Sequence, residues 1–246
     1  MTDQLDLSEL KTFADWCRAK DRLPSEAKRT VEALLEKIEW DESEYEWDWS
    51  PDSGDFELAE RHFLADTELS LRDCYGDSFQ LTDLRPLASF THLTSLDLNG
   101  DMKGQERSEL SDISVLSSFT NLTELNLSGN SITDLSPLAA LTELRELDLS
   151  GNFITDLSPI KALKNLTDLS LCGDQAYRLT ESIDFSPLLA LTQLKDLGLS
   201  DNEISDRSLE TIAQLTTLER LWISHNRITD ISPLATLSKM IINSMP

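Results

Sequence analysis

Residues 122–140 read LTELNLSGNSITDLSPLAA, and residues 144–162 read LRELDLSGNFITDLSPIKA. The second phrase starts 22 residues after the first, and its D-x-S-P core returns at Asp184 and Asp230, as DFSPLLA and DISPLAT. Self-similar phrases at a fixed step of roughly 20–50 residues are the sequence signature of a solenoid, in which each unit stacks on the next. The chain is therefore predicted to form a stack of short coils.

The register of this repeat extends in both directions from residue 122. Leucines at positions 1, 4 and 6 of each unit, and those around the S-P pair, cannot be enclosed by one unit alone, so stacked neighbours must bury them. The L-x-L stretches then become parallel strands about 4.8 Å apart. Leu125, Leu147 and Leu169 are expected on successive rungs. Seven units are predicted, with starts at Asp66, Leu93, Leu122, Leu144, Leu166, Leu194 and Leu218.

The ninth position of the unit is expected to hold the turns together. An asparagine amide there can satisfy backbone groups of adjacent coils and so form a ladder along the stack. Cysteine and aspartate are plausible substitutes, which makes a structural role for Cys74 the better interpretation. Ser136 and Pro137 suit the start of a short helical turn on the outer face. The ninth position reads Cys74, Asp101, Asn130, Asn152, Asp174, Asn202 and Asn226.

The pattern L-x-x-L-x-L-x-x-N, continued as N-x-I-x-D-L-S-P-L, resembles the leucine-rich repeat family over residues 66–246. It is similar to the 22-residue class found in bacterial internalins and in regulatory subunits of eukaryotic protein phosphatases. The resemblance implies an α/β solenoid, a curved horseshoe with a parallel concave sheet of about seven repeats and an N-terminal helical cap. It also implies that the concave face binds other proteins.

Residues 1–39 lack the repeat and predict the helical cap. Apolar residues recur at helical spacing from Leu7 to Cys17, which predicts a first helix. Ser25 is expected to cap a second helix that ends near Ile38. A cap is expected because the first coil of a solenoid would otherwise expose its apolar end. An independent domain is the alternative.

Residues 40–65 form an acidic and aromatic segment. Tyr45, Trp47 and Trp49 alternate with acidic residues, the period of a strand with one apolar face. The sequence favours a hairpin in which the stretch FEL from Phe56 returns as the partner strand. A disordered segment that binds a partner is the alternative.

Composition limits the classes of function. The 246 residues carry 45 acidic and 21 basic side chains, a formal net charge of −24. Such a surface repels nucleic acid and anionic lipid and attracts basic partners. No secretory signal and no apolar run of about 20 residues are found, and three scattered cysteines predict no disulfide framework, so a cytoplasmic protein without membrane contact is expected.

Catalytic chemistry finds no support in the sequence. Only three histidines are present, His62, His92 and His225, and none lies in a recognised catalytic motif. The cysteines and histidines lack the spacing of a zinc site. We therefore predict a non-enzymatic protein without a metal or another cofactor.

Positions 3, 5 and 7 of the repeat point onto the concave face, because alternate residues of a strand face opposite sides. Five of the seven residues at position 3 are acidic, although like charges on adjacent strands destabilise a sheet. A column that lowers stability is a candidate binding feature, and Trp222 at its end is a candidate apolar anchor. The predicted partner-binding residues are Glu68, Asp97, Glu124, Asn126, Glu146, Asp148, Asp168, Asp196, Arg220 and Trp222.

These observations predict a scaffold or adaptor that binds the basic surface of another protein. A solvated face in an already acidic protein would explain the column equally simply. One alternative function is an inhibitor or immunity protein that occupies a nucleic-acid-binding site by charge mimicry. Another, from the internalin resemblance, is a host-directed bacterial effector.

Two further surfaces attract attention. Insertions lengthen some coils and are expected along one edge of the sheet, as a binding edge or as tolerated drift; they lie near 75–80, 102–109, 175–182 and 205–208. The C-terminal end has no obvious cap, since Asn243 stands where Met240 as a repeat start would require leucine. An open edge there could support self-association, and a short protected edge is the alternative.

Overall fold

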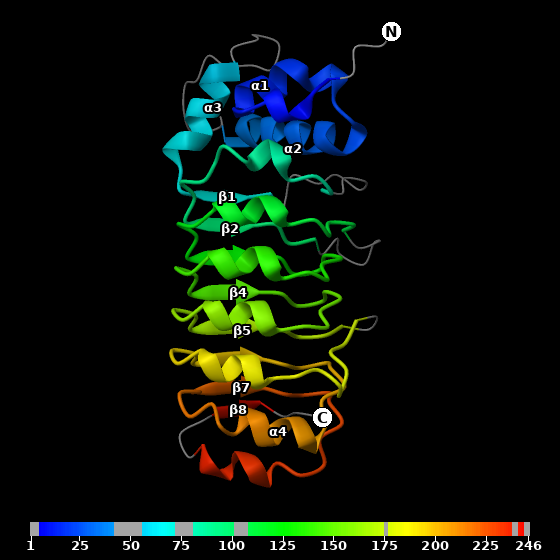
Figure 1. Cartoon of the computed structure of the whole chain (residues 1–246), viewed down its shortest axis with the longest axis vertical. Coiled ribbons are helices and arrows are strands. Elements are labelled where there is room, and N and C mark those ends of the chain that lie inside the picture. Colours follow the sequence, from blue (N-terminus) through cyan, green and yellow to red (C-terminus); the bar gives the residue numbers. More distant parts are fainter. Residues whose placement is uncertain are drawn as a thin grey trace.

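The computed structural model of the 246-residue chain describes residues 5–41, 56–71, 81–100, 108–174, 177–237 and 241–243. They form an elongated stack with helices at its N-terminal end (Figure 1). Eight short strands pair in chain order into one open, parallel sheet. The strands are β1 Glu68–Ser70, β2 Ser95–Asp97, β3 Glu124–Asn126, β4 Glu146–Asp148, β5 Asp168–Ser170, β6 Asp196–Gly198, β7 Arg220–Trp222 and β8 Ile241–Asn243.

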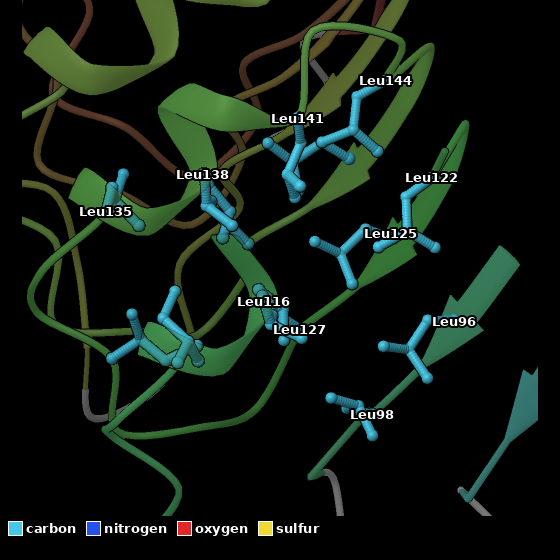
Figure 2. Close-up of a cluster of buried hydrophobic side chains, with 14 of the residues drawn as sticks. Leu96, Leu98, Leu116, Leu122, Leu125, Leu127, Leu135, Leu138, Leu141 and Leu144 are labelled. Atoms are coloured by element: carbon cyan, nitrogen blue, oxygen red, sulfur yellow. The ribbon is translucent and has the colours of Figure 1, made fainter. Parts of the chain in front are cut away.

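The register of the sheet follows the repeat. Leu125 pairs with Leu147, and Leu147 pairs with Leu169, so the position-4 leucines lie on successive rungs as predicted. These leucines are buried together with those at positions 1 and 6 and those of the outer turns. Figure 2 shows leucines from the strands and from the outer turns filling the space between them. A continuous core therefore runs along the stack.

Short 3₁₀ turns form the outer face and stack on one another. Each S-P turn is preceded by an aspartate that fixes it: Asp134 accepts hydrogen bonds from the Ser136 backbone N–H and hydroxyl, both at 2.8 Å. The equivalent bonds of Asp184 to Ser186 lower the pKa of that carboxyl. The turns are η5 Arg85–Leu87, η6 Ser114–Ser118, η7 Ser136–Ala140, η8 Ser158–Ala162, η9 Ser186–Ala190 and η10 Ser232–Thr236.

The predicted asparagine ladder is confirmed at Asn130, Asn152, Asn202 and Asn226. The Asn152 side-chain amide donates to the carbonyls of Leu127 at 2.8 Å and Leu149 at 3.0 Å, and its oxygen accepts from the Ile132 N–H at 3.0 Å. Each such asparagine thereby joins its own coil to the preceding one. Asp174, at the same position of its coil, accepts from the backbone N–H of Tyr177 at 2.8 Å and so closes the loop of its own coil. Cys74 and Asp101 lie outside the described residues.

The predicted helical cap is also confirmed. Phe13 and Phe63 from the cap meet Phe90 of the first coil, with ring centroids 5.2–5.6 Å apart. These aromatic rings seal the apolar end of the solenoid. The N-terminal elements are η1 Leu7–Glu9, α1 Phe13–Ala19, η2 Lys20–Arg22, α2 Ser25–Asp41 and α3 Phe56–Ala65.

Three details of this region differ from the prediction. The first α-helix begins only at Phe13, because Thr12 and Asp15 form a capping box that fixes its start. The second helix includes Ser25 and continues to Asp41. The stretch FEL begins helix α3 and is not a strand, because its apolar residues continue at helical spacing to the buried Ala59 and Phe63. The proposed aromatic strand at residues 44–49 lies outside the described residues.

The insertion near residues 205–208 does not form a loop along the sheet edge. It starts helix α4, Asp206–Ile212, which replaces the 3₁₀ turn of that coil. Asp206 accepts hydrogen bonds from Thr229 and Asp230 of the next coil, so the helix is fixed to its neighbour. Of the other insertions, residues 177–182 are described and lie beside the asparagine turn, where the Leu179 N–H donates to Asn202.

The C-terminal end carries one strand more than the predicted seven. Strand β8 pairs with β7 in parallel, and Ile242 stands opposite Leu221. The predicted phase was therefore wrong by one residue: an isoleucine, and not Asn243, occupies the position-4 register. The side chain of Ile241 is 62% exposed on this last strand.

Candidate partner-binding face

The face of the sheet opposite the core is built from positions 3 and 5 of the repeat. Parallel pairing places Glu124, Glu146 and Asp168 side by side on β3, β4 and β5. We call these three residues the acidic row. Glu124 and Glu146 are exposed and Asp168 is partly exposed, so the carboxylates face solvent.

A groove of about 570 Å³ runs along this face from β2 to β7. Eight of the ten predicted partner-binding residues line it, and Glu68 and Arg220 do not. Glu68 lies on the first strand, beyond the N-terminal end of the groove. The predicted residues that the structure brings together are Asp97, Glu124, Asn126, Glu146, Asp148, Asp168, Asp196 and Trp222.

Arg220 closes the C-terminal end of the acidic column by pairing with Asp196. Its guanidinium forms a two-point ion pair with that carboxylate, with Nη2 2.7 Å from Oδ2 and Nε in contact with Oδ1. The same guanidinium lies 5.7 Å from the centre of the Trp222 ring. The pair lowers the pKa of Asp196 and raises that of Arg220. Asp196 is only 8% exposed, and the ion pair with Arg220 neutralises its charge within the chain.

The acidic row, in contrast, has no ion-paired cation among the described residues, and Arg220, which pairs with Asp196, attracts only the Asp168 end of the row. Glu124 accepts a hydrogen bond from the Ser95 hydroxyl at 3.2 Å. The salt bridges formed among the described residues include none to the acidic row. Partial burial, followed by the neighbouring Glu124 and Asp168 charges, raises the pKa of Glu146. The middle of the row is therefore a site where negative charge is held unfavourably.

The polar side chains at position 5 accept hydrogen bonds from backbone N–H groups at the end of their own strand. Asp97 accepts from the Asn99 N–H at 3.0 Å, and Asp148 accepts from the Ser150 N–H at 2.9 Å. Asn126 accepts from the Ser128 N–H and hydroxyl. The second oxygen of Asp97 also accepts from the Ser70 hydroxyl at 3.3 Å. The carboxylates of Asp97 and Asp148 nevertheless line the groove, so position 5 supplements the charge of the acidic row.

The structure adds groove residues that were not among the predicted partner-binding residues. Cys172, at position 7, and Gly198 lie between Ser170 and Trp222 at the C-terminal end of the groove. A Cβ on Gly198 would lie only 3.0 Å from the Cys172 sulfur and the Ser170 hydroxyl, so these two side chains crowd the position and favour glycine there. The strand alternation assigns position 7 to this face together with positions 3 and 5, and Cys172 and Gly198 were omitted only because neither residue is charged or aromatic.

The functional groups of the groove are carboxylates, amides, hydroxyls, a thiol and an indole. Within the described ranges, no three His, Cys, Asp or Glu side chains are placed to hold a metal ion together. The other described cysteine, Cys17, is buried in the cap, and burial raises its pKa to about 12. In the same part of the chain, no helix has the length and apolar character for a membrane span.

Comparison with known proteins identifies the repeats. A sequence model described as "Leucine Rich repeats (2 copies)" matches residues 142–182 and 192–236, and one described as "Leucine Rich repeat" matches residues 120–135. The comparison with curated proteins gives no match.

Solved structures extend this similarity to the three-dimensional fold. Internalin C2 from Listeria monocytogenes is 31% identical, with a TM-score of 0.60 over 74% of this chain and 72% of that chain. An internalin F from the same species is 30% identical, with a TM-score of 0.50 over 75% and 62%. A leucine-rich repeat protein from Leptospira interrogans is 25% identical, with a TM-score of 0.54 over 75% and 50%. The repeat phrase, the parallel sheet and the internalin structures together show that the chain belongs to the leucine-rich repeat family, in its internalin-like class.

Proposed function

We propose that this protein is a non-enzymatic interaction module whose groove binds a basic surface of another protein. The observation that carries the proposal is the acidic row, three solvent-facing carboxylates in register that form no salt bridge within the part of the chain that the structure describes. A basic partner would supply the missing positive charge. Trp222, at the end of the groove, offers an apolar contact of the kind common in interface centres.

The electrostatics of the row supports this proposal. Carboxylates on adjacent strands, about 4.8 Å apart, repel by roughly 1 kcal/mol per pair in water before salt screening. Asp196 shows that the same column accepts a guanidinium with two-point geometry. A partner arginine or lysine on the acidic row would therefore form an ion pair like the one between Arg220 and Asp196.

Charge reversal tests the proposal. The triple variant Glu124→Lys, Glu146→Lys, Asp168→Lys should lose binding to a labelled lysine-rich peptide, measured by fluorescence anisotropy at low and physiological ionic strength. The matched control reverses three exposed acidic residues outside the groove, Glu143, Glu181 and Glu210. Both variants change the net charge equally, so only binding at the groove distinguishes them.

An equal loss of affinity in both variants would show attraction to the overall charge and would reject this groove. If the groove variant alone loses peptide binding, capture from lysate identifies the partner: it is a basic protein that the wild type and the control retain and the groove variant does not. Competition between that partner's nucleic acid and this protein would favour the charge-mimicking inhibitor. The cytoplasmic location and self-association through the edge of β8 remain predictions, which fractionation and concentration-dependent gel filtration test.

A further inference from the structure

The acidic row has a spacing that restricts which basic structure can match it. Its members lie on three adjacent strands, in register, and each is one strand step from the next. A strand step is about 4.8 Å, so the row spans about 9.6 Å from β3 to β5. The row ends there, because Asp196 on β6 is already paired with Arg220.

We infer that the occupant of the groove is an α-helix of the partner, lying across the strands with lysine or arginine at positions i, i+4 and i+7. This inference rests on the proposed function and specifies the shape of the basic partner. Three cations on one helix face would then each meet one carboxylate of the acidic row.

Helical spacing fits the row better than extended spacing does. A helix rises about 1.5 Å per residue, so side chains at i and i+7 are separated by about 10.5 Å along its axis, close to the length of the row. Side chains on one face of an extended segment are about 6.6 Å apart, and three of them span about 13 Å. An extended segment therefore loses register with the row, and a helix keeps it within the reach of flexible lysine or arginine side chains.

The C-terminal end of the groove adds an apolar requirement. Trp222 on β7 lies two strand steps beyond Ser170, in the position-5 column beside the acidic row, and Gly198 on the strand between them has no side chain. Two steps correspond to about six or seven helical residues. An apolar side chain near position i+14 would therefore stand level with the indole, which lies two residues along its strand from the column of the acidic row.

Three synthetic peptides with equal lysine content test the inference on the full-length protein. The first is an alanine-based helix of about 20 residues with lysine at i, i+4 and i+7 and leucine at i+14. The second has the same composition with lysines distributed around all faces. The third carries its three lysines at alternate positions within a threonine-rich sequence of the same length and favours an extended chain. Circular dichroism establishes the conformation of each, and anisotropy measures affinity.

The first peptide is expected to bind at least about tenfold more tightly than either of the others. Glu146→Gln should weaken the first peptide selectively, and Glu143→Gln, on the turn before β4, should leave it unchanged. Trp222→Ala should weaken the peptide that carries leucine at i+14 and not a version with alanine there.

The alternative outcomes separate this inference from the proposed function. Equal binding of all three peptides would mean that the face recognises charge without register, and tightest binding of the alternating peptide would assign an extended occupant. Either result overturns the helix and leaves the proposed function standing. Failure of all three peptides to bind would overturn both.

Discussion

Glu146 shows at the level of one residue how the proposed binding face opposes stability. Its pKa is raised by partial burial and by the carboxylates of Glu124 and Asp168. A raised pKa means that the folded state disfavours the charged form. The stability associated with this group is therefore fully present below the ordinary glutamate pKa, about 4.3, and is lost as the pH rises through the higher folded pKa.

Glu146→Gln should consequently stabilise the protein at neutral pH while weakening a basic partner. Because the side chain is exposed and screened by salt, a gain of a few tenths to about 1 kcal/mol is expected. Thermal unfolding should show it at pH 7 and not near pH 3.5, below the ordinary pKa. Glu143→Gln is the control. An unchanged or lower melting temperature at pH 7 would contradict the electrostatic account of the row.

Asn152 is a second residue whose role can be measured. It is 6% exposed, and its amide satisfies carbonyls of two coils while its oxygen accepts the Ile132 N–H. Asn152→Ala leaves these buried backbone groups without partners, so a loss of about 2–4 kcal/mol is expected in denaturant unfolding. The exposed Asn165, with one hydrogen bond to the Thr142 carbonyl, is the matched control and should cost less than about 1 kcal/mol. Similar losses at both sites would refute the ladder's role.

For single residues, the sequence predicted the interactions that recur in every coil and missed those that occur in one coil only. Asparagine at the ninth position has the same surroundings in successive coils, so its bonds follow from the period. Arg220 and Asp196 were assigned to the same column, but their pairing depends on one guanidinium turning toward its neighbour. The pairing also divides the column into a neutralised end and the acidic row, which a count of charges does not show.

Among the elements, the helical cap has the most direct stability test. Phe63 on α3 is 5% exposed and contacts Phe13 and Phe90, and the neighbouring Leu64 is 48% exposed. Phe63→Ala should cost about 3–5 kcal/mol in the cap, and Leu64→Ala much less. Hydrogen exchange should show the loss first in β1 and β2, because a solenoid unit contacts only its neighbours. Uniform loss of protection as far as β6 would argue against this local coupling.

The helices and strands also show which parts of the secondary structure the sequence could predict and which it could not. Strands β1 to β7 and the ladder follow from the 22-residue phrase and its lengthened forms. Helix α3 was missed because three residues, FEL, fit a strand as well as a helix, and only the continuation to Ala59 and Phe63 decides. Strand β8 was placed one residue out of phase, since the degenerate last unit lacks the leucines that define the register.

The whole molecule combines a net charge of −24 with a sheet that aligns carboxylates. Repulsion over this charge destabilises the compact state, and salt screens it over a Debye length of about 8 Å near 0.15 M. Raising sodium chloride from low to physiological concentration should therefore raise the unfolding midpoint. A double variant, Glu124→Gln with Glu146→Gln, should gain less from the same salt. A midpoint insensitive to salt, or equal gains in both proteins, would contradict this prediction.

Each coil adds one strand to the sheet and therefore lengthens the groove by one strand step. Inserting a second copy of residues 144–165 would add another Glu146 equivalent and lengthen the acidic row by about 4.8 Å. The repeat number thus works as a molecular ruler: evolution or an engineer could set the length of the ligand that fits by copying one unit, without redesigning a single contact.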